Sequence, residues 1–342
     1  MHGHSWLLPV QLNVIRLILL YFATLPMQVH RNIDDLPAFR KPVLTIGTFD
    51  GVHKGHRQIV EQLQEVASHS GGETVIITFH PHPRTVVGTS LPKIHLINTI
   101  EERIELLSPL IDHLVIVPFT EIFSRMTASE YVEHFLVEKF HPHTVVIGYD
   151  HRFGRDRKGD YHLLEFFRDK GLFNLVEIPP HVLDHNAVSS TRIRDAIARG
   201  EVDTASHLLG YDFFFSGKVV EGNKLGRKLG YPTANLDLQQ VEKLIPGDGV
   251  YAVLALLSGY EEPLQGMMNI GVRPTIESSE RASDRVIEVN LFNFNDQLYG
   301  EMVKVFVKKR LRDEVKFPGL DELVEQMAID KENTLKALNA RG

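Results

Sequence analysis

Residues 43–70 carry the pattern that most limits what this chain can fold into. An apolar run at 43–46 is followed by the ten residues GTFDGVHKGH at 47–56. After them, apolar side chains recur at the spacing of a helix face as far as Ser70. This order predicts a buried strand, a loop broken by glycines and a helix. Such a loop directs main-chain N–H groups and the positive end of a helix toward a bound anion.

The residue types of this loop suit phosphate. Gly47, Gly51 and Gly55 permit close approach of the backbone and a positive φ where one is needed. His53 and His56 are three residues apart, so both reach one face of the first helical turn. From there the two rings can donate to the same phosphate as charge grows in a transition state.

The histidine pair has two other interpretations. It could be polar surface at a helix start, or it could hold zinc together with the nearby His80 and His82. The chain contains no cysteine, and no carboxylate stands at the spacing of a metalloprotease motif. We therefore expect a phosphate site.

Strand-like and helix-like segments alternate from residue 43 to about residue 200. The expected strands are 43–47, 74–79, 114–119, 144–149 and 174–178. Capping boxes of the form Thr-x-x-Glu at Thr99 and Thr127 mark two helix starts. Apolar strands that alternate with helices indicate an α/β domain with a doubly wound parallel sheet, where ligands bind at the carboxyl ends of the strands.

The pattern changes after Gly210. Short strands are expected at 213–220, 250–257, 264–270, 286–294 and 303–307, with no long helix between them. This indicates a C-terminal antiparallel β-barrel, closed by a helix at 318–339. We expect one domain at 27–208 and another at 209–342.

The first 26 residues differ from the rest. Their apolar block at 17–23 is shorter than the roughly 20 residues that cross a bilayer. A signal peptide is one interpretation, but Arg16 abuts the block and no small-x-small cleavage site follows. Translation from Met27 is the other, and we expect residues 1–26 to be an extension or a mis-assigned start.

Composition limits the partners and the compartment. The net charge of −7 argues against general binding to nucleic acid or to a membrane surface. The absence of cysteine excludes disulfides and thiolate zinc sites, and it agrees with a cytoplasmic location.

A second glycine-rich segment, GNKLGRKLGYPTAN, begins at Gly222. The glycines Gly222, Gly226 and Gly230 are four apart and disfavour a helix. Arg227 and Lys228 make the loop basic, which suits phosphate. A hydrophilic β-turn is the alternative.

Thr233 and Asn235 alternate along the extended segment after Pro232, so their oxygens point to one side. Paired oxygen ligands suit Mg²⁺. Further on, Glu288 alternates with the apolar Ile287, which predicts that Glu288 faces a cavity or solvent.

Four segments resemble, in order, the adenylyltransferase region of the bifunctional bacterial riboflavin kinase/FMN adenylyltransferases. The first is the loop with its His-x-Gly-His core. The others are TFHPHP at 78–83, IGYDHRFG at 147–154 and SSTRIR at 189–194. The resemblance covers residues 43–199.

This resemblance implies an ATP site with His53 and His56 as its catalytic pair. The implied ATP contacts are Gly47, Phe49, Asp50, Gly51, Gly55, Asp150, Arg152, Ser190, Thr191 and Arg194. His151 stands where many members of the family carry Phe, so this loop is expected to contact flavin or adenine differently. The hydroxyls of Ser190 and Thr191 have helix capping as a second interpretation. For Arg155, Arg157 and Lys158 a solvated charge run is the alternative.

The segment from Gly222 resembles the signature of riboflavin kinases. Segments DGVYA at 248–252, NIGVRPT at 269–275, VIEVNL at 286–291 and LRDEVKF at 311–317 continue the match. The implied roles are phosphate contacts from Gly222, Gly226, Arg227, Lys228 and Gly230, Mg²⁺ ligands Thr233 and Asn235, and flavin contacts Arg312, Glu314 and Phe317. Glu288 is implied as the base that takes the proton of the ribityl 5′-hydroxyl.

Together the two resemblances imply that ATP phosphorylates riboflavin in the barrel, and that a second ATP adenylylates the FMN product in the N-terminal domain. The products are FAD and pyrophosphate. A nucleotidyltransferase for another phosphorylated metabolite is one alternative. A flavin- or nucleotide-binding sensor with decayed sites is the other, and the intact Glu288, His53 and His56 argue against it.

Overall fold

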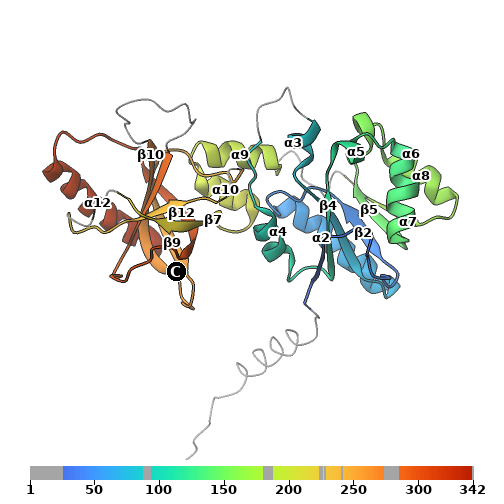
Figure 1. The fold of residues 1–342 in the computed structure, drawn as a ribbon, viewed down its shortest axis with the longest axis horizontal. Helices are drawn as coiled ribbons and strands as arrows, with labels where there is room; N and C mark the ends of the chain where they lie inside the picture. Colours follow the sequence, from blue (N-terminus) through green and yellow to red (C-terminus); the bar gives the residue numbers. More distant parts are fainter. Residues whose placement is uncertain are drawn as a thin grey trace, which may run out of the picture. The chain divides into compact units, whose positions relative to one another are not determined.

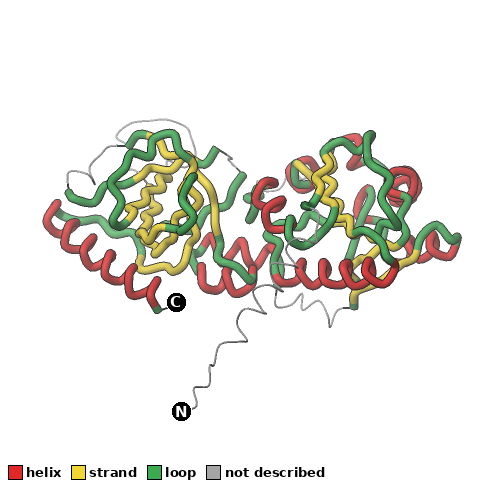
Figure 2. Tube along the Cα trace, turned by 90° about the horizontal axis from the view of Figure 1, so that it is seen from below, coloured by secondary structure: helices red, strands yellow, loops and turns green. Residues whose placement is uncertain are grey.

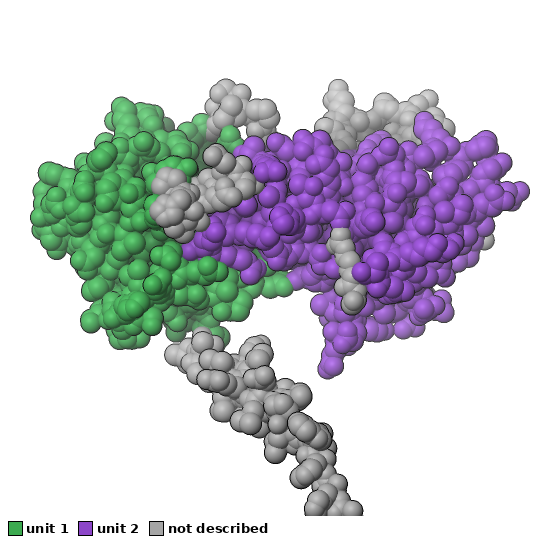
Figure 3. Space-filling view, turned by 180° about the vertical axis from the view of Figure 1, so that it is seen from behind, with its two compact units in different colours: residues 1–48, 59–89, 104–179 green, residues 49–58, 90–103, 180–342 purple. Residues whose placement is uncertain are grey.

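The computed structural model describes residues 26–87, 94–179, 188–222, 226, 229–239, 242–272 and 285–340. These residues fall into two compact units, coloured separately in Figure 3. Unit 1 takes residues 1–48, 59–89 and 104–179, and unit 2 takes residues 49–58, 90–103 and 180–342. The extension expected at 1–26 lies outside the described residues, apart from Pro26. The loop at 47–56 is divided between the two units, so the expected boundary near residue 208 stays a prediction about domains.

Unit 1 is built on a parallel sheet of six strands among the described residues. They are β1 (Gln28–His30), β2 (Val43–Ile46), β3 (Thr74–His80), β4 (His113–Pro118), β5 (Thr144–Gly148) and β6 (Asn174–Ile178). The strand order is β1-β4-β3-β2-β5-β6. From β2 the chain adds β3 and β4 on one side and then β5 and β6 on the other, which confirms a doubly wound sheet. The switch point of such a sheet is where ligands bind, and here it lies between β2 and β5.

Helices connect these strands (Figure 1). Helices α2 (Lys54–Ser70) and α4 (Ile100–Leu107) begin in unit 2 and end in unit 1. The others of unit 1 are α3 (Pro83–Val87), α5 (Glu121–Ser124), α6 (Ala128–Glu130), η1 (Tyr131–Val137), α7 (Glu138–Phe140), η2 (Arg155–Arg157) and α8 (Tyr161–Asp169). Both predicted capping boxes are present, at Thr99 and at Thr127.

The core of unit 1 forms where the sheet meets these helices. All four residues of β2 are buried, and β3 is buried except for its last residue. A strand covered on both faces carries apolar residues without alternation, which is why these strands are continuous apolar runs. Leu44 and Ile77 of the sheet pack in one cluster with Phe135 and Phe167 of the helices.

Unit 2 contains a closed antiparallel barrel, as predicted. Its strands are β7 (Phe214–Val220), β8 (Ala234–Asp237), β9 (Gly249–Leu257), β10 (Leu264–Val272), β11 (Arg285–Leu291) and β12 (Met302–Arg312), in the order β10-β11-β8-β7-β12-β9. Strand β8 was not among the expected strands; it lies in the extended segment after Pro232 and lacks the continuous apolar run that predicted the four-residue β2. Helices α9 (Ser190–Ala198) and α10 (Val202–Leu209) precede the barrel.

The long helix α12 (Leu320–Asn339) closes the chain and contacts strands β9, β10 and β12. Figure 2 shows it as the red helix that ends beside the label C. Inside the barrel, Phe215, Val253 and Met268 pack in one buried cluster with Ile287 and Val289 of β11. Because side chains alternate along a strand, Glu288 between them faces away from this core.

Candidate active sites

The loop after β2 adopts backbone conformations that L-residues rarely take. The φ angle is +47° at Phe49, +33° at Val52 and +94° at Gly51. A positive φ at a β-branched residue such as Val52 costs on the order of 1–3 kcal/mol and persists only where the surroundings enforce it. Phe49 and Val52 are both buried, so packing supplies that constraint. Backbone strain is thus concentrated where the sequence predicts a phosphate site.

His53 lies directly before α2 and caps its first turn. Its Nδ1 accepts a hydrogen bond from the main-chain N–H of His56 at 3.3 Å. In the neutral ring the proton is then on Nε2, which is the atom able to donate to an anion. The rings of His53 and His56 stack, with centroids 3.7 Å apart and planes 12° apart. The structure therefore brings the predicted catalytic pair together at a helix N-terminus.

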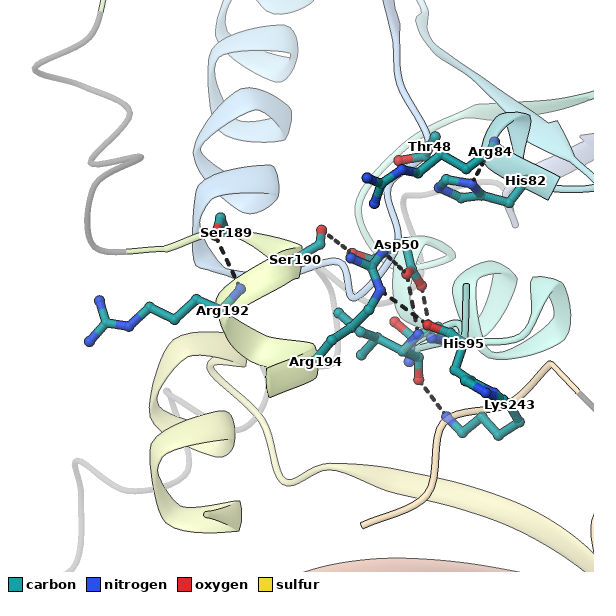
Figure 4. Close-up of polar contacts among 12 residues, drawn as sticks. Thr48, Asp50, His82, Arg84, His95, Ser189, Ser190, Arg192, Arg194 and Lys243 are labelled. Atoms are coloured by element: carbon teal, nitrogen blue, oxygen red, sulfur yellow. Dashed lines mark hydrogen bonds and ion pairs between the residues drawn. The ribbon is translucent and has the colours of Figure 1, made fainter. Parts of the chain in front are cut away.

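Asp50 is fully buried and ties the loop to other segments of unit 2 (Figure 4). Its carboxylate accepts hydrogen bonds from the main-chain N–H groups of Ile97, at 3.2 Å, and Asn98, at 3.0 Å. The Arg194 guanidinium donates to it at 2.7 Å. The hydroxyl of Ser190 donates to the main-chain oxygen of Asp50 at 2.9 Å. These contacts support a role in holding the loop, and direct ATP contact by Asp50 stays a prediction.

The start of α9 differs from one interpretation of the sequence. The capping hydroxyl belongs to Ser189, which accepts a hydrogen bond from the N–H of Arg192 at 3.3 Å. Ser189 has the extended backbone of an N-cap, whereas Ser190 is already helical. Ser190 instead bonds Asp50, and Thr191 is exposed. A capping role for Ser190 or Thr191 is therefore wrong.

Asp150 and Arg152 follow β5 in unit 1, next to the edge where Gly47 follows β2. The Arg152 guanidinium pairs with Asp160, the N-cap of α8, at 2.7 Å. A phosphate would compete with that carboxylate for the guanidinium. The two histidines belong to unit 2, so their assembly with Arg152 stays a prediction.

His151 is largely buried beside Phe153, with ring centroids 5.8 Å apart. Burial lowers the pKa of His151 to about 4, against the opposing effect of the Asp150 charge. The ring is therefore neutral at pH 7. The neighbouring Arg155, Arg157 and Lys158 are exposed, as a solvated charge run would be.

A cavity of about 360 Å³ lies in unit 2, against the barrel. Its wall contains most of the residues that the sequence assigns to the kinase site: Gly226, Thr233, Glu288, Arg312, Glu314 and Phe317. Glu288 pairs across the strands with Asn235 on one side and Asn269 on the other. Segments that are far apart in the sequence thus meet at one cavity.

Asn235 lies next to this cavity and requires the glycine at 222. A Cβ on Gly222 would stand 2.2 Å from Asn235 Nδ2, so a larger residue there would displace the Asn235 amide. The turn that follows is closed by the N–H of Tyr231, which donates to the oxygen of Gly226 at 2.8 Å. Gly230 has φ of +82°. Arg227 and Lys228 lie outside the described residues, so their roles stay predictions.

Two cavity residues were not given a role by the sequence. Asn290 Nδ2 donates to the Pro232 oxygen at 2.7 Å and thereby fixes the segment that carries Thr233. Asp330 of α12 is 3% exposed and accepts both guanidinium branches of Arg312, the shorter bond being 2.7 Å. Their signals in the sequence are modest: Asn290 shares the face of Glu288, and Asp330 interrupts the apolar stripe of α12.

Comparison with known proteins matches both regions of the chain to one family of enzymes. The family model of FAD synthetase matches residues 36–192, and that of riboflavin kinase matches residues 209–338. A bifunctional riboflavin kinase/FMN adenylyltransferase of Buchnera aphidicola is 36% identical over 92% of this chain and 99% of its own length. The chain belongs to the family of bifunctional riboflavin kinase/FMN adenylyltransferases.

Other relatives extend the comparison. The enzyme of the same description from Bacillus subtilis is 35% identical over 86% of this chain and 92% of its own length. A crystal structure described as a macrolide-efflux protein from Streptococcus pneumoniae has a TM-score of 0.80 and 32% identity, and covers 90% of this chain and 98% of that one. Among the residues of this chain that the structure describes, no helix has the length and apolarity needed to cross a membrane.

A second cavity of about 320 Å³ shares Thr233 with the first. Residues 294–299 form much of its wall, together with Val219 and Leu291. No role was predicted for residues 294–299 from the sequence. In this family member the two cavities meet at the threonine predicted to hold Mg²⁺.

Proposed function

We propose that the two sites divide the reactions of the family between them. The barrel cavity phosphorylates riboflavin with ATP, and the strained loop at 47–56 directs adenylyl transfer from a second ATP to FMN. The observation that carries this proposal is the meeting of Thr233, Glu288 and Arg312 at one cavity, because each comes from a different predicted motif.

In the barrel, Glu288 is the group that accepts the proton of the ribityl 5′-hydroxyl. The alkoxide oxygen then bonds the γ-phosphorus of ATP while the bond to the ADP oxygen breaks, which gives FMN and ADP. Arg312 and Phe317 face each other, with the guanidinium carbon 5.7 Å from the ring centroid, and offer a flat cationic wall to the flavin. Asp330 keeps that guanidinium in place.

Oxygen donors at this site fit Mg²⁺. The Thr233 hydroxyl lines the cavity, and Asn235 pairs directly with Glu288 across the strands. A hydroxyl, an amide oxygen and a carboxylate are hard ligands of the kind that this ion prefers. Thr233 and Asn235 would hold the ion, which when bound neutralises charge on the phosphates of ATP.

The second cavity is the place we assign to the adenosine of this ATP. It shares Thr233 with the first cavity, so a nucleotide lying across that residue would direct its phosphates toward Glu288. Phe294 and Tyr299 provide apolar surface for a base, and Asn295 provides an amide.

At the loop, a phosphate oxygen of FMN bonds the α-phosphorus of ATP, and pyrophosphate leaves. No nucleophile of the protein is required, so catalysis consists of positioning and charge neutralisation. His53 donates through Nε2, because its Nδ1 is occupied by the N–H of His56. A cytoplasmic location stays a prediction that rests on the cysteine-free composition.

The test is product chromatography of the purified full chain with ATP and Mg²⁺. Riboflavin is expected to give FMN and then FAD, and FMN alone is expected to give FAD. FAD formation from FMN without FMN formation from riboflavin would favour a nucleotidyltransferase with a different first substrate. Flavin binding with neither product would favour the sensor and contradict the proposal.

A further inference from the structure

Lys243 is a buried lysine that contacts the segment at 97–102, and this segment in turn binds Asp50 of the loop at 47–56. Its side chain is 2% exposed. The ammonium donates to the main-chain oxygen of Ile97 at 2.6 Å and to the Glu102 carboxylate at 2.5 Å. All three residues belong to unit 2, and Figure 4 shows Lys243 directed toward the segment beside Asp50.

Main-chain hydrogen bonds fix the same segment. The N–H of Leu96 donates to the oxygen of Glu242 at 2.7 Å, and the N–H of Leu244 donates to the oxygen of Leu96 at 2.8 Å. Leu96 and Lys243 form an isolated parallel bridge. A strand-like pairing and a buried ammonium therefore hold residues 96–98 from the same side.

Residue 97 links this support to the loop. Its main-chain oxygen accepts from Lys243, and its N–H donates to Asp50. Glu102 adds a second link, because it closes the capping box by accepting the N–H of Thr99 at 3.0 Å. The peptide between residues 97 and 98 accepts from Lys243 through its oxygen and donates to Asp50 through the N–H of Asn98, so the contacts run from Lys243 through one peptide to Asp50, and from Asp50 to Arg194.

The charge on Lys243 is expensive to bury, and its two acceptors offset part of that cost, together with the Phe213 ring, whose centroid lies 4.8 Å from the ammonium. Burial lowers the pKa of Lys243, while the negative charges of Glu102 and Asp50 oppose this shift. An apolar residue of similar volume would fill the space at lower cost. A role in placing the peptide at Ile97 accounts for an ammonium at this position.

We propose that Lys243 is a positioning residue for adenylyl transfer, holding the peptide that binds Asp50. The proposal rests on our assignment of that reaction to the loop at 47–56. Lys243 lies within the part of the chain that matches riboflavin kinases, residues 209–338, so a residue of the kinase match serves the site of the FAD synthetase match.

The decisive variant is Lys243→Met combined with Glu102→Gln. Methionine alone would leave a buried carboxylate without its partner and destabilise the protein. In the double variant glutamine keeps the capping box, so the fold is preserved while the bond to the Ile97 oxygen is lost. We expect kcat for FAD formation from FMN to fall at least about tenfold, since misplaced catalytic groups cost rate more than binding.

Riboflavin phosphorylation by the same sample reports whether unit 2 is folded, and we expect it within about twofold of the unaltered protein. The control is Lys336→Met, which removes the charge of an exposed lysine of the same unit that pairs with Glu332. This control is expected to keep both activities. A double variant with both activities intact would show that Lys243 only fills space, and it would overturn the proposal.

Lys243→Arg decides the question if the double variant loses both activities. Arginine retains donors for Glu102 and Ile97, so FAD formation is expected to recover to within about fivefold of the unaltered rate. Normal phosphorylation with FAD formation as low as background in Lys243→Arg would contradict the proposal. If the unaltered protein makes no FAD from FMN, the proposed function fails. This result differs from failure of the Lys243 proposal, in which the unaltered protein makes FAD.

Discussion

The Asp50 carboxylate and the Arg194 guanidinium meet at 2.7 Å, although 144 residues separate them in the chain. Asp50 is fully buried, and the side chain of Arg194 is 15% exposed. Such a pair is stable only when both partners and their hydrogen bonds are complete. It therefore couples the conformation of the loop at 47–56 to the position of α9.

Replacing Asp50 by asparagine is expected to lower the free energy of unfolding by about 3 kcal/mol, because Arg194 loses its buried partner. FAD formation should fall at least about tenfold, while riboflavin phosphorylation persists. Urea unfolding and product chromatography measure the two effects. The control is Glu121→Gln, which breaks an ion pair with Arg125 whose side chains are both 76% exposed and should cost less than about 1 kcal/mol. Equal losses in the two variants would refute the coupling.

Replacing Glu288 by glutamine is expected to slow FMN formation by about 10²–10⁴-fold, because the amide cannot accept the proton of the 5′-hydroxyl. Conversion of supplied FMN to FAD should continue at the unaltered rate. The exposed Glu301 of the same unit provides the control, Glu301→Gln, which should leave both rates unchanged. Normal phosphorylation in Glu288→Gln would remove the proposed base.

The two roles of His53 can be separated by two substitutions. His53→Asn keeps an acceptor for the N–H of His56 and so keeps the cap, whereas His53→Ala loses it at a cost of about 1 kcal/mol. Both lack the ring donor, so both should lose FAD formation by about 10²–10³-fold. His53→Ala with His56→Ala should abolish it and spare phosphorylation. Full activity in His53→Asn, with thermal unfolding unchanged, would show that the histidine only caps the helix.

Replacing Asp330 by asparagine is expected to release Arg312 and weaken flavin binding. The KM for riboflavin should rise about tenfold, whereas kcat changes less, because we propose that Arg312 contacts the flavin, away from the reacting oxygen. Steady-state phosphorylation at varied riboflavin measures both constants. Asp321→Asn, at an exposed position in the first turn of the same helix, should leave both unchanged. A fall in kcat at constant KM would argue against this role.

His151 makes stability depend on pH, since its pKa is lowered from 6.5 to about 4 in the folded chain. The unfolded chain binds the proton first, so the stabilisation is complete above pH 6.5 and is lost as the pH falls toward 4. The difference in the free energy of unfolding between His151→Phe and the unaltered protein should therefore shift by about 2 kcal/mol in favour of the variant when the pH falls from 7 to 5. Urea unfolding at the two pH values measures this difference. An equal effect of His151→Phe at the two pH values would exclude His151 as the source.

Local pattern was sufficient for much of the fold. The strands of the parallel sheet from β2 to β6 and four of the six barrel strands were predicted to within three residues at each end, since their apolar patterns are local properties. Strand β12 was also predicted, but it runs five residues past its expected end at 307. The exceptions are β1 and β8, of three and four residues. Neither has the continuous apolar run by which the equally short β2 was predicted, so their pairing partners define them.

The candidate sites divide in the same way. Glycine loops, the histidine pair and the alternation around Glu288 are visible in the sequence because they lie within single segments. The partners of Asp50 and Arg312 are not visible, since Arg194 and Asp330 come from distant helices. Thus the sequence by itself determined which residues are the candidates for the chemistry. Only the tertiary structure decided which residues hold them, because burying a charge requires a partner that any distant segment can supply.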